Sequence, residues 1–378
     1  MIDYEIVRVI WWVLISVVLI AFVITDGFDM GVGILLPFIG KTDTERRIMI
    51  NAIAPHWDGN QVWLITGGAG IFAAWPTAYA VSFSGFYIAM ILVLCALFFR
   101  PIGFDYRSKL ENSKWRNMWD IAIFFGSFVP ALVFGVAFGN LLEGVPFRFD
   151  ISKRAFYDGS FFELLNPFAI LAGIVSLMLI VAHGGAWLQM KTSGELYLRA
   201  RKATQIASLV MLIAFVLAGV WVAFGIHGYE ITSAIDHNGV SNPLAKTVST
   251  DSSWLNNYMN YPILWAVPAL GVLLPLLTIF FSSVNKNGLV FLSSSLTIAC
   301  VLLTYGIATF PFIMPSSIMP NASLTIWDAT SSQLTLNIMF GVVVIFLPIV
   351  LFYTIWSYIK MFGRLDKNHI ENNKHSLY

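Results

Sequence analysis

Apolar residues recur along the chain in runs of about 20, separated by short polar segments. A run of this length is enough for an α-helix to cross the hydrocarbon core of a bilayer. The pattern predicts an all-α integral membrane protein with about nine transmembrane helices. We expect them near residues 6–28, 48–74, 78–99, 118–142, 167–188, 203–226, 263–281, 288–312 and 336–358.

The connections between these runs are short of apolar residues. None has both the length and the apolar content that a separate core requires. We therefore expect residues 1–378 to form a single polytopic membrane domain.

The second apolar run is interrupted by polar residues. It contains Pro55-His56-Trp57-Asp58-Gly59-Asn60-Gln61-Val62-Trp63. An ionisable side chain at membrane depth costs roughly 2.5 to 3.5 kcal/mol on insertion scales, so residues of this kind usually have a function. If the helix is regular, Asp58 lies about ten residues, or roughly 15 Å, inside one end of the run.

Positive charge is distributed unevenly across the predicted spans. All but five of the 22 Lys and Arg residues fall on one side, including Lys367 and Lys374 in the C-terminal tail. The exceptions are Arg8, Arg148, Lys153, Arg154 and Lys246. Because Lys and Arg accumulate in cytoplasmic segments, the N-terminus is expected outside and the C-terminus in the cytoplasm.

The composition agrees with a membrane protein and excludes several other classes. Hydrophobic residues make up 58% of the chain and charged residues only 11%, which is too apolar for a soluble domain. The formal net charge of +1 gives no indication of nucleic-acid binding. Both cysteines, Cys95 and Cys300, fall within predicted spans, where a thiol usually fills space as a small apolar group.

Several acids and one arginine gather toward the predicted cytoplasmic side. Asp26 and Asp29 come late in the first span and share a helix face. Arg100 closes the third span, Asp105 follows it, and Asp120 opens the fourth. With Asp58, these residues form a polar series. Burial raises the pKa of a carboxyl group and a nearby arginine lowers it, so carboxyl groups in such a series can take up and release protons. Interfacial ion pairing is an equally good explanation for every member except Asp58.

Two alternatives follow from the residues alone. His56 and His183 both lie in spans and are candidate haem ligands, but the chain has no local histidine or cysteine motif for a metal or haem. We therefore expect no metal site. A proton-coupled secondary transporter would also bury acids among helices interrupted by Gly and Pro. It would show two related halves, and the sequence shows none.

Several long motifs resemble subunit II of the cytochrome bd quinol oxidases, particularly the enterobacterial type that oxidises ubiquinol. The resemblance extends over essentially the whole chain. The motifs are Thr25-Asp-Gly-Phe-Asp-Met-Gly31, Pro55-His-Trp-Asp-Gly-Asn-Gln-Val-Trp63, Phe98-Phe-Arg-Pro-Ile-Gly-Phe-Asp-Tyr-Arg107 and Trp327-Asp-Ala-Thr-Ser-Ser-Gln333. The segment from Glu230 to Asn256 resembles the family only loosely.

The resemblance implies a subunit of a respiratory quinol oxidase in the bacterial inner membrane. Such a complex passes electrons from quinol to dioxygen and takes the protons for water from the cytoplasm. The fold implied is two four-helix bundles with a peripheral helix, paired as a heterodimer with subunit I. Subunit I is expected to hold the haems, two of type b and one of type d. Subunit II can hold a structural ubiquinone, and a small single-span accessory subunit can join the complex.

The resemblance also implies roles for individual residues. Asp58 matches an acid proposed to start a proton path at the subunit interface, and Trp63 matches a tryptophan near a proposed oxygen path. Asp26, Asp29, Arg100 and Asp105 match further polar positions, which serve either the proton path or the structure.

Overall fold

The protein is described by a computed structural model in which residues 1–365 are placed, so Lys367 and Lys374 lie outside the described residues. The described chain is almost entirely helical, which confirms the all-α membrane fold. Eight helical segments are long and apolar enough to cross a membrane. They are α1 (Tyr4–Ile39), α5 (Tyr87–Arg107), α6 (Ser113–Glu143), α7 (Pro167–Lys191), α8 (Gly194–Gly225), α10 (Ala266–Ser283) with the preceding turn η2 (Pro262–Trp265), α11 (Asn287–Thr309) and α12 (Gln333–Lys360).

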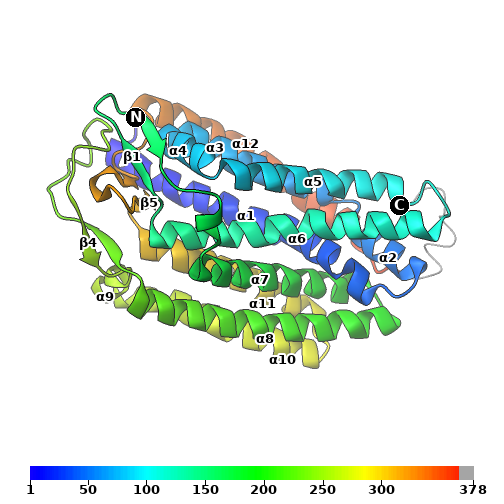
Figure 1. The fold of residues 1–378 in the computed structure, drawn as a ribbon. Coiled ribbons are helices and arrows are strands. Elements are labelled where there is room, and N and C mark those ends of the chain that lie inside the picture. The colour runs from blue at the N-terminus through cyan, green and yellow to red at the C-terminus, as the bar shows by residue number, and fades with distance from the viewer. Residues whose placement is uncertain (366–378) are drawn as a thin grey trace.

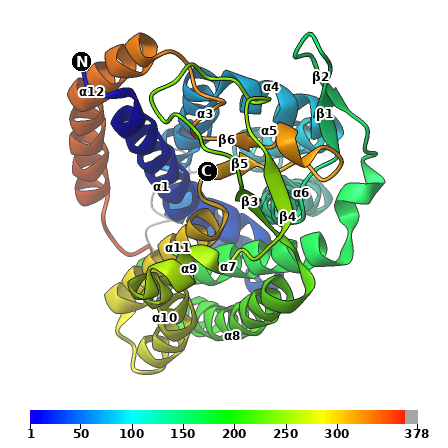
Figure 2. The same ribbon diagram turned by 90° about the vertical axis from the view of Figure 1, so that its left-hand side faces the viewer.

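The long helices form two groups that lie side by side, with α12 at the edge (Figures 1 and 2). The first group contains α1, α5, α6 and the less apolar helix α3 (Trp57–Ala74). In the second group, α7 and α10 each pack against both α8 and α11. Contacts of α7 with α1 and α6 join the groups. This is the arrangement of two bundles and a peripheral helix that the resemblance implies.

The predicted second span, residues 48–74, is not one regular helix. Helix α2 (Asp43–Ile53) ends before Pro55, and α3 begins only at Trp57. A proline ring removes an N–H donor and disfavours helical conformation in the preceding residue, so the break occurs where the polar run begins. The expectation that Asp58 lies ten residues inside a regular helix is therefore wrong, because Asp58 is in the first turn of α3.

Two other boundaries differ from the hydropathy prediction. Helix α1 continues to Ile39, so Asp26 and Asp29 lie well inside it rather than at its cytoplasmic edge. The predicted span 78–99 is divided between α4 (Pro76–Gly85) and α5. The first difference arises because Asp26 and Asp29 lower the local hydropathy without ending the helix that buries them.

Short strands and turns cover the end of the molecule where the N-terminus lies (Figure 2). Three antiparallel pairs form here. They are β1 (Phe147–Phe149) with β2 (Ala155–Tyr157), β3 (Gly228–Ile231) with β4 (Val248–Ser252), and β5 (Phe312–Met314) with β6 (Leu324–Thr325). The same region includes α9 (Asn256–Asn260) and the 3-10 turns η1 (Phe162–Leu165) and η3 (Pro320–Ala322).

A buried ion pair joins two of these covering segments. Lys246 Nζ lies 2.8 Å from Asp328 Oδ2, and both side chains are almost inaccessible to solvent. Burial raises the pKa of Asp328, against the opposing effect of Lys246, and lowers the pKa of Lys246. The segment from Glu230 to Asn256 therefore packs firmly onto the motif that contains Asp328.

Candidate functional site

A fully buried ion pair connects α1 and α5 inside the first group of helices. Arg100 donates from Nη1 to Asp26 Oδ2 at 2.9 Å and from Nη2 to Asp26 Oδ1 at 2.6 Å. Both side chains have zero exposure. The bidentate geometry matches the planar guanidinium to the carboxylate, so one positive and one negative charge neutralise each other.

Asp29 lies one turn further along α1 and has no arginine of its own. Its Oδ2 accepts a hydrogen bond of 2.7 Å from Asn60 Nδ2, and Asn60 Oδ1 accepts one of 2.6 Å from Tyr358 Oη. The chain of contacts links α1 to α3 and then to the end of α12. Asp29 is completely buried.

Three buried polar atoms have no hydrogen-bond partner among the residues that the structure describes: Asp29 Oδ1, Arg100 Nε and His56 Nε2. The His56 ring is stacked on the ring of Tyr358, with centroids 4.0 Å apart and planes 3° from parallel. Unpartnered polar atoms are rare in protein interiors, so each of these three calls for an explanation. We call Asp26, Asp29, His56, Asn60, Arg100 and Tyr358 the central polar cluster.

Of the two candidate haem ligands, His183 does not fit that role. His183 is fully buried, with Nδ1 2.8 Å from Ser294 Oγ and Nε2 2.9 Å from the carbonyl oxygen of Ile24. Both ring nitrogens are therefore engaged, and neither is free for an iron. His56 packs flat on Tyr358. Among residues 1–365, no three His, Cys, Asp or Glu side chains form a group able to hold a metal ion.

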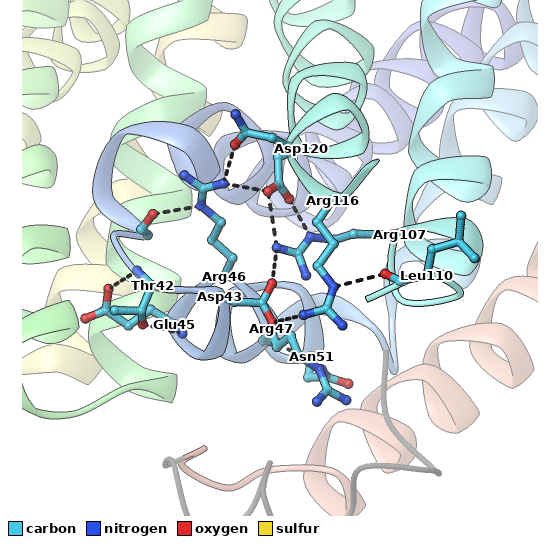
Figure 3. Close-up of polar contacts among 12 residues, drawn as sticks. Thr42, Asp43, Glu45, Arg46, Arg47, Asn51, Arg107, Leu110, Arg116 and Asp120 are labelled. Carbon is cyan, nitrogen blue, oxygen red and sulfur yellow. Dashed lines mark hydrogen bonds and ion pairs between the residues drawn. The ribbon is translucent and has the colours of Figure 1, made fainter. Parts of the chain in front are cut away.

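A second polar network lies where α2, α5 and α6 meet (Figure 3). Asp120 accepts hydrogen bonds from Arg107 Nε at 2.5 Å and from Arg46 Nη1 at 2.7 Å. Asp43 accepts from Arg107 at 2.9 Å and from Arg116 at 2.8 Å. Burial lowers the pKa of the neighbouring Arg47 against the effect of Asp43. Asp120 is thus a structural acid that ties three helices together.

Asp58 and Asp105 contact neither network through any described hydrogen bond. Both are exposed on the surface of the isolated chain. Asp58 nevertheless lies deep, because it precedes Asn60 by about 3 Å along α3, and Asn60 contacts the central polar cluster. From Arg100 in that cluster, α5 continues about 10 Å to Arg107. Helix α3 begins on the side where α5 ends, so the step from Asn60 back to Asp58 leads toward Arg107, and Asp58 lies less than about 10 Å inside the end of α5, between Arg100 and Arg107 in depth.

Trp63 is buried, at 8% exposure, in the same hydrophobic core as Phe22 and Ile53. Its position one turn beyond Asn60 places it next to the central polar cluster. A tryptophan packed in this way fills core volume and also presents an apolar surface to its neighbours.

Sequence reasoning missed the roles of Asn60 and Tyr358. Asn60 is part of the polar run, but an amide carries no charge and attracts less notice than Asp58. Tyr358 comes near the end of the last span, where a tyrosine is normally attributed to the aromatic belt. Only the packing of α12 against α1 brings Tyr358 to Asn60.

The chain resembles known proteins over its full length. The family profile for cytochrome bd terminal oxidase subunit II matches residues 7–361. Cytochrome bd-I ubiquinol oxidase subunit 2 of Escherichia coli strain K12 is 64% identical over 379 aligned residues, which cover 100% of both chains. A probable cytochrome oxidase subunit 2 of Haemophilus influenzae is 60% identical with the same coverage. Cytochrome bd ubiquinol oxidase subunit 2 of Bacillus subtilis is 33% identical over 92% of this chain and 94% of its own.

A solved structure, that of the bd oxidase from Geobacillus thermodenitrificans, contains a chain of similar fold. The TM-score is 0.67 at 14% sequence identity, over 95% of this chain and 99% of the other. At this identity the similarity supports the fold alone.

Proposed function

Because the chain belongs to the family of cytochrome bd terminal oxidase subunit II, and is thus a subunit of a quinol-oxidising oxidoreductase, we propose that it is the haem-free subunit that supplies part of the proton uptake. The family assignment gives no support to the transporter alternative and implies haems in the complex and a subunit I partner. The observation that carries the proposal is an exposed carboxylate, Asp58, two residues before Asn60, which contacts the buried Asp29.

The haems belong to subunit I in this proposal. Support comes from His183, whose two ring nitrogens are both hydrogen-bonded. Haem iron needs an axial nitrogen, sulfur or oxygen ligand that is free to bind it. When bound in the complex, the haems supply the electron transfer and oxygen chemistry, whereas this chain provides packing surface and ionisable groups.

Replacement of both histidines tests the assignment of the haems. We expect the His56→Phe/His183→Gln complex to keep its full haem content, because neither side chain binds iron. The measurement is a reduced-minus-oxidised spectrum of the purified complex, normalised to the amount of subunit I. Loss of one haem signal from a complex with both subunits present would assign that haem to this chain and overturn the proposal.

Asp58 is proposed to receive protons from the cytoplasmic side. Lipid cannot solvate a carboxylate at this depth, so a charged Asp58 needs protein or water over it. Gly59 beside it has no atom within 4 Å of the position of an added Cβ, so a neighbouring helix can approach closely here. We therefore place subunit I over this face of α3. Asp105, on the exposed side of α5 between Arg100 and Arg107, extends the path toward the cytoplasm.

Asp58→Asn is expected to lower quinol oxidase turnover of the intact complex on the order of tenfold, because the amide cannot exchange a proton. Asp58→Glu keeps the carboxylate and should retain most of the activity. Glu111→Gln, which removes an exposed acid between α5 and α6, is the matched control and should leave turnover unchanged. If the Asp58→Asn complex turns over like the control, Asp58 is a structural acid of the first turn of α3.

The remaining parts of the proposal follow the family resemblance. Trp63 is proposed to line an apolar oxygen path. The chain is proposed to form one polytopic domain in the inner membrane, with its N-terminus outside and its C-terminus in the cytoplasm. A structural ubiquinone and a small single-span subunit are proposed as further components.

The apolar groove between α7 and α8, about 690 Å³ in volume and lined by Leu171, Trp221 and Phe224 among others, suits an isoprenoid or acyl chain.

A further inference from the structure

The central polar cluster contains one more acid than it has arginines. Arg100 uses both of its terminal nitrogens on Asp26, and Asp29 receives only the neutral amide of Asn60. The ionisable side chains of Asp26, Asp29 and Arg100 all have zero exposure. If both acids were ionised, the cluster would hold an uncompensated negative charge inside the first helix bundle, which is strongly unfavourable.

Within residues 1–365, no cation other than Arg100 adjoins Asp29, and none forms an ion pair with it. The polar groups around Asp29 come from four helices. They are Asp26 on the same helix, Asn60 on α3 with His56 just before it, Arg100 on α5 and Tyr358 on α12. His56 and, on α7, His183 can also become positive, but both ring nitrogens of His183 are engaged by Ser294 and the carbonyl oxygen of Ile24. The His56 ring is stacked on Tyr358, and its Nε2 makes no hydrogen bond to Asp29 among the described residues.

The hydrogen bonds are those expected if Asp29 carries a proton. Its Oδ2 accepts from Asn60, whose orientation is fixed because Asn60 Oδ1 accepts from Tyr358. Its Oδ1 has no partner among the described residues. An unpartnered oxygen costs far less on a neutral acid than on a carboxylate, since only the ion loses its full solvation.

We propose that Asp29 is a neutral carboxylic acid that stores one proton in the resting complex, that Asp26 carries the charge, and that Asn60 and Tyr358 are positioning residues for Asp29. The proton is titratable, because the Asn60 amide and nearby Arg100 also stabilise the carboxylate formed when it leaves. The use of this stored proton in proton uptake rests on the proposed function. The assignment of the charge to Asp26 and of the proton to Asp29 does not depend on Asp58.

The test compares two isosteric substitutions in the intact complex. Asn mimics a neutral Asp, so Asp29→Asn should assemble with normal haem content and stability. Asp26→Asn leaves Arg100 without its counterion and should strongly reduce the yield of assembled complex. Equal damage by the two substitutions would overturn the assignment of the charge.

Infrared spectroscopy supplies a readout that a structural role would not change. We expect wild-type complex to show a carbonyl stretch of a protonated carboxylic acid that shifts in heavy water and is missing from Asp29→Asn. Asn60→Leu should shift this band, because it removes the amide donor. Asp58→Asn should retain the band, so failure of the Asp58 proposal and failure of this one are distinguishable. Identical spectra of wild-type and Asp29→Asn complexes would contradict the stored proton.

Discussion

Arg100→Gln is expected to abolish stable assembly of the complex. Among the described residues, Arg100 is the cation that hydrogen-bonds to Asp26, so the substitution leaves that acid buried without compensation. Breaking a buried ion pair in this way typically costs about 3–5 kcal/mol, which is comparable to the whole stability of many domains. The measurement is the amount of complex recovered from membranes, together with its rate of thermal inactivation.

A partly exposed pair between α6 and α2 provides the control. Arg116 contacts Asp43, but the side chains are 26% and 40% exposed. Partly solvated pairs contribute about 0–1 kcal/mol, so Arg116→Gln should be recovered at nearly the wild-type yield. Recovery of Arg100→Gln at the level of Arg116→Gln would show that the central ion pair does not hold α1 and α5 together.

Gly184→Val is expected to separate the two groups of helices and to cost on the order of 3 kcal/mol. Gly184 on α7 and Gly31 on α1 touch through their backbones. A Cβ at Gly184 would lie 2.5 Å from the Cα of Gly31, and one at Gly31 would lie 2.8 Å from the Cα of Gly184. Since a backbone cannot rotate away as a side chain can, both helices would have to move.

Gly219 on α8 is the matched position, because no atom lies within 4 Å of its added Cβ. Gly219→Val should therefore leave the yield and thermal stability of the complex almost unchanged. If Gly184→Val behaves in the same way, the close approach of α1 and α7 is not required for the fold.

Hydropathy was sufficient to predict the fold class and most of the helices. Long apolar runs leave few alternatives to helices that cross a membrane. It failed at α2 and α3, where Pro55 ends one helix and the following polar run begins another. It also ended the first span too early, because Asp26 and Asp29 lower the local hydropathy even though Arg100 and Asn60 satisfy them inside the protein.

The site was predicted only in part. Charge at membrane depth identified Asp26, Asp29 and Arg100, but the pairing of Asp26 with Arg100 joins residues 74 positions apart. Such a pairing depends on how α1 and α5 are rotated against each other, and helix periodicity does not determine rotation between neighbours. Tyr358 carries no charge and comes from the far end of the chain, so only the packed structure brings it to Asn60.

The central claim is that Asp58 takes up protons for a chemistry carried out on subunit I. The most direct test is the rate of proton uptake from the cytoplasmic side during quinol oxidation, measured on the intact complex in proteoliposomes. The account predicts that Asp58→Asn slows uptake and turnover together, on the order of tenfold, and that Asp58→Glu restores most of both. Unaltered proton uptake and charge translocation by an assembled Asp58→Asn complex would contradict it.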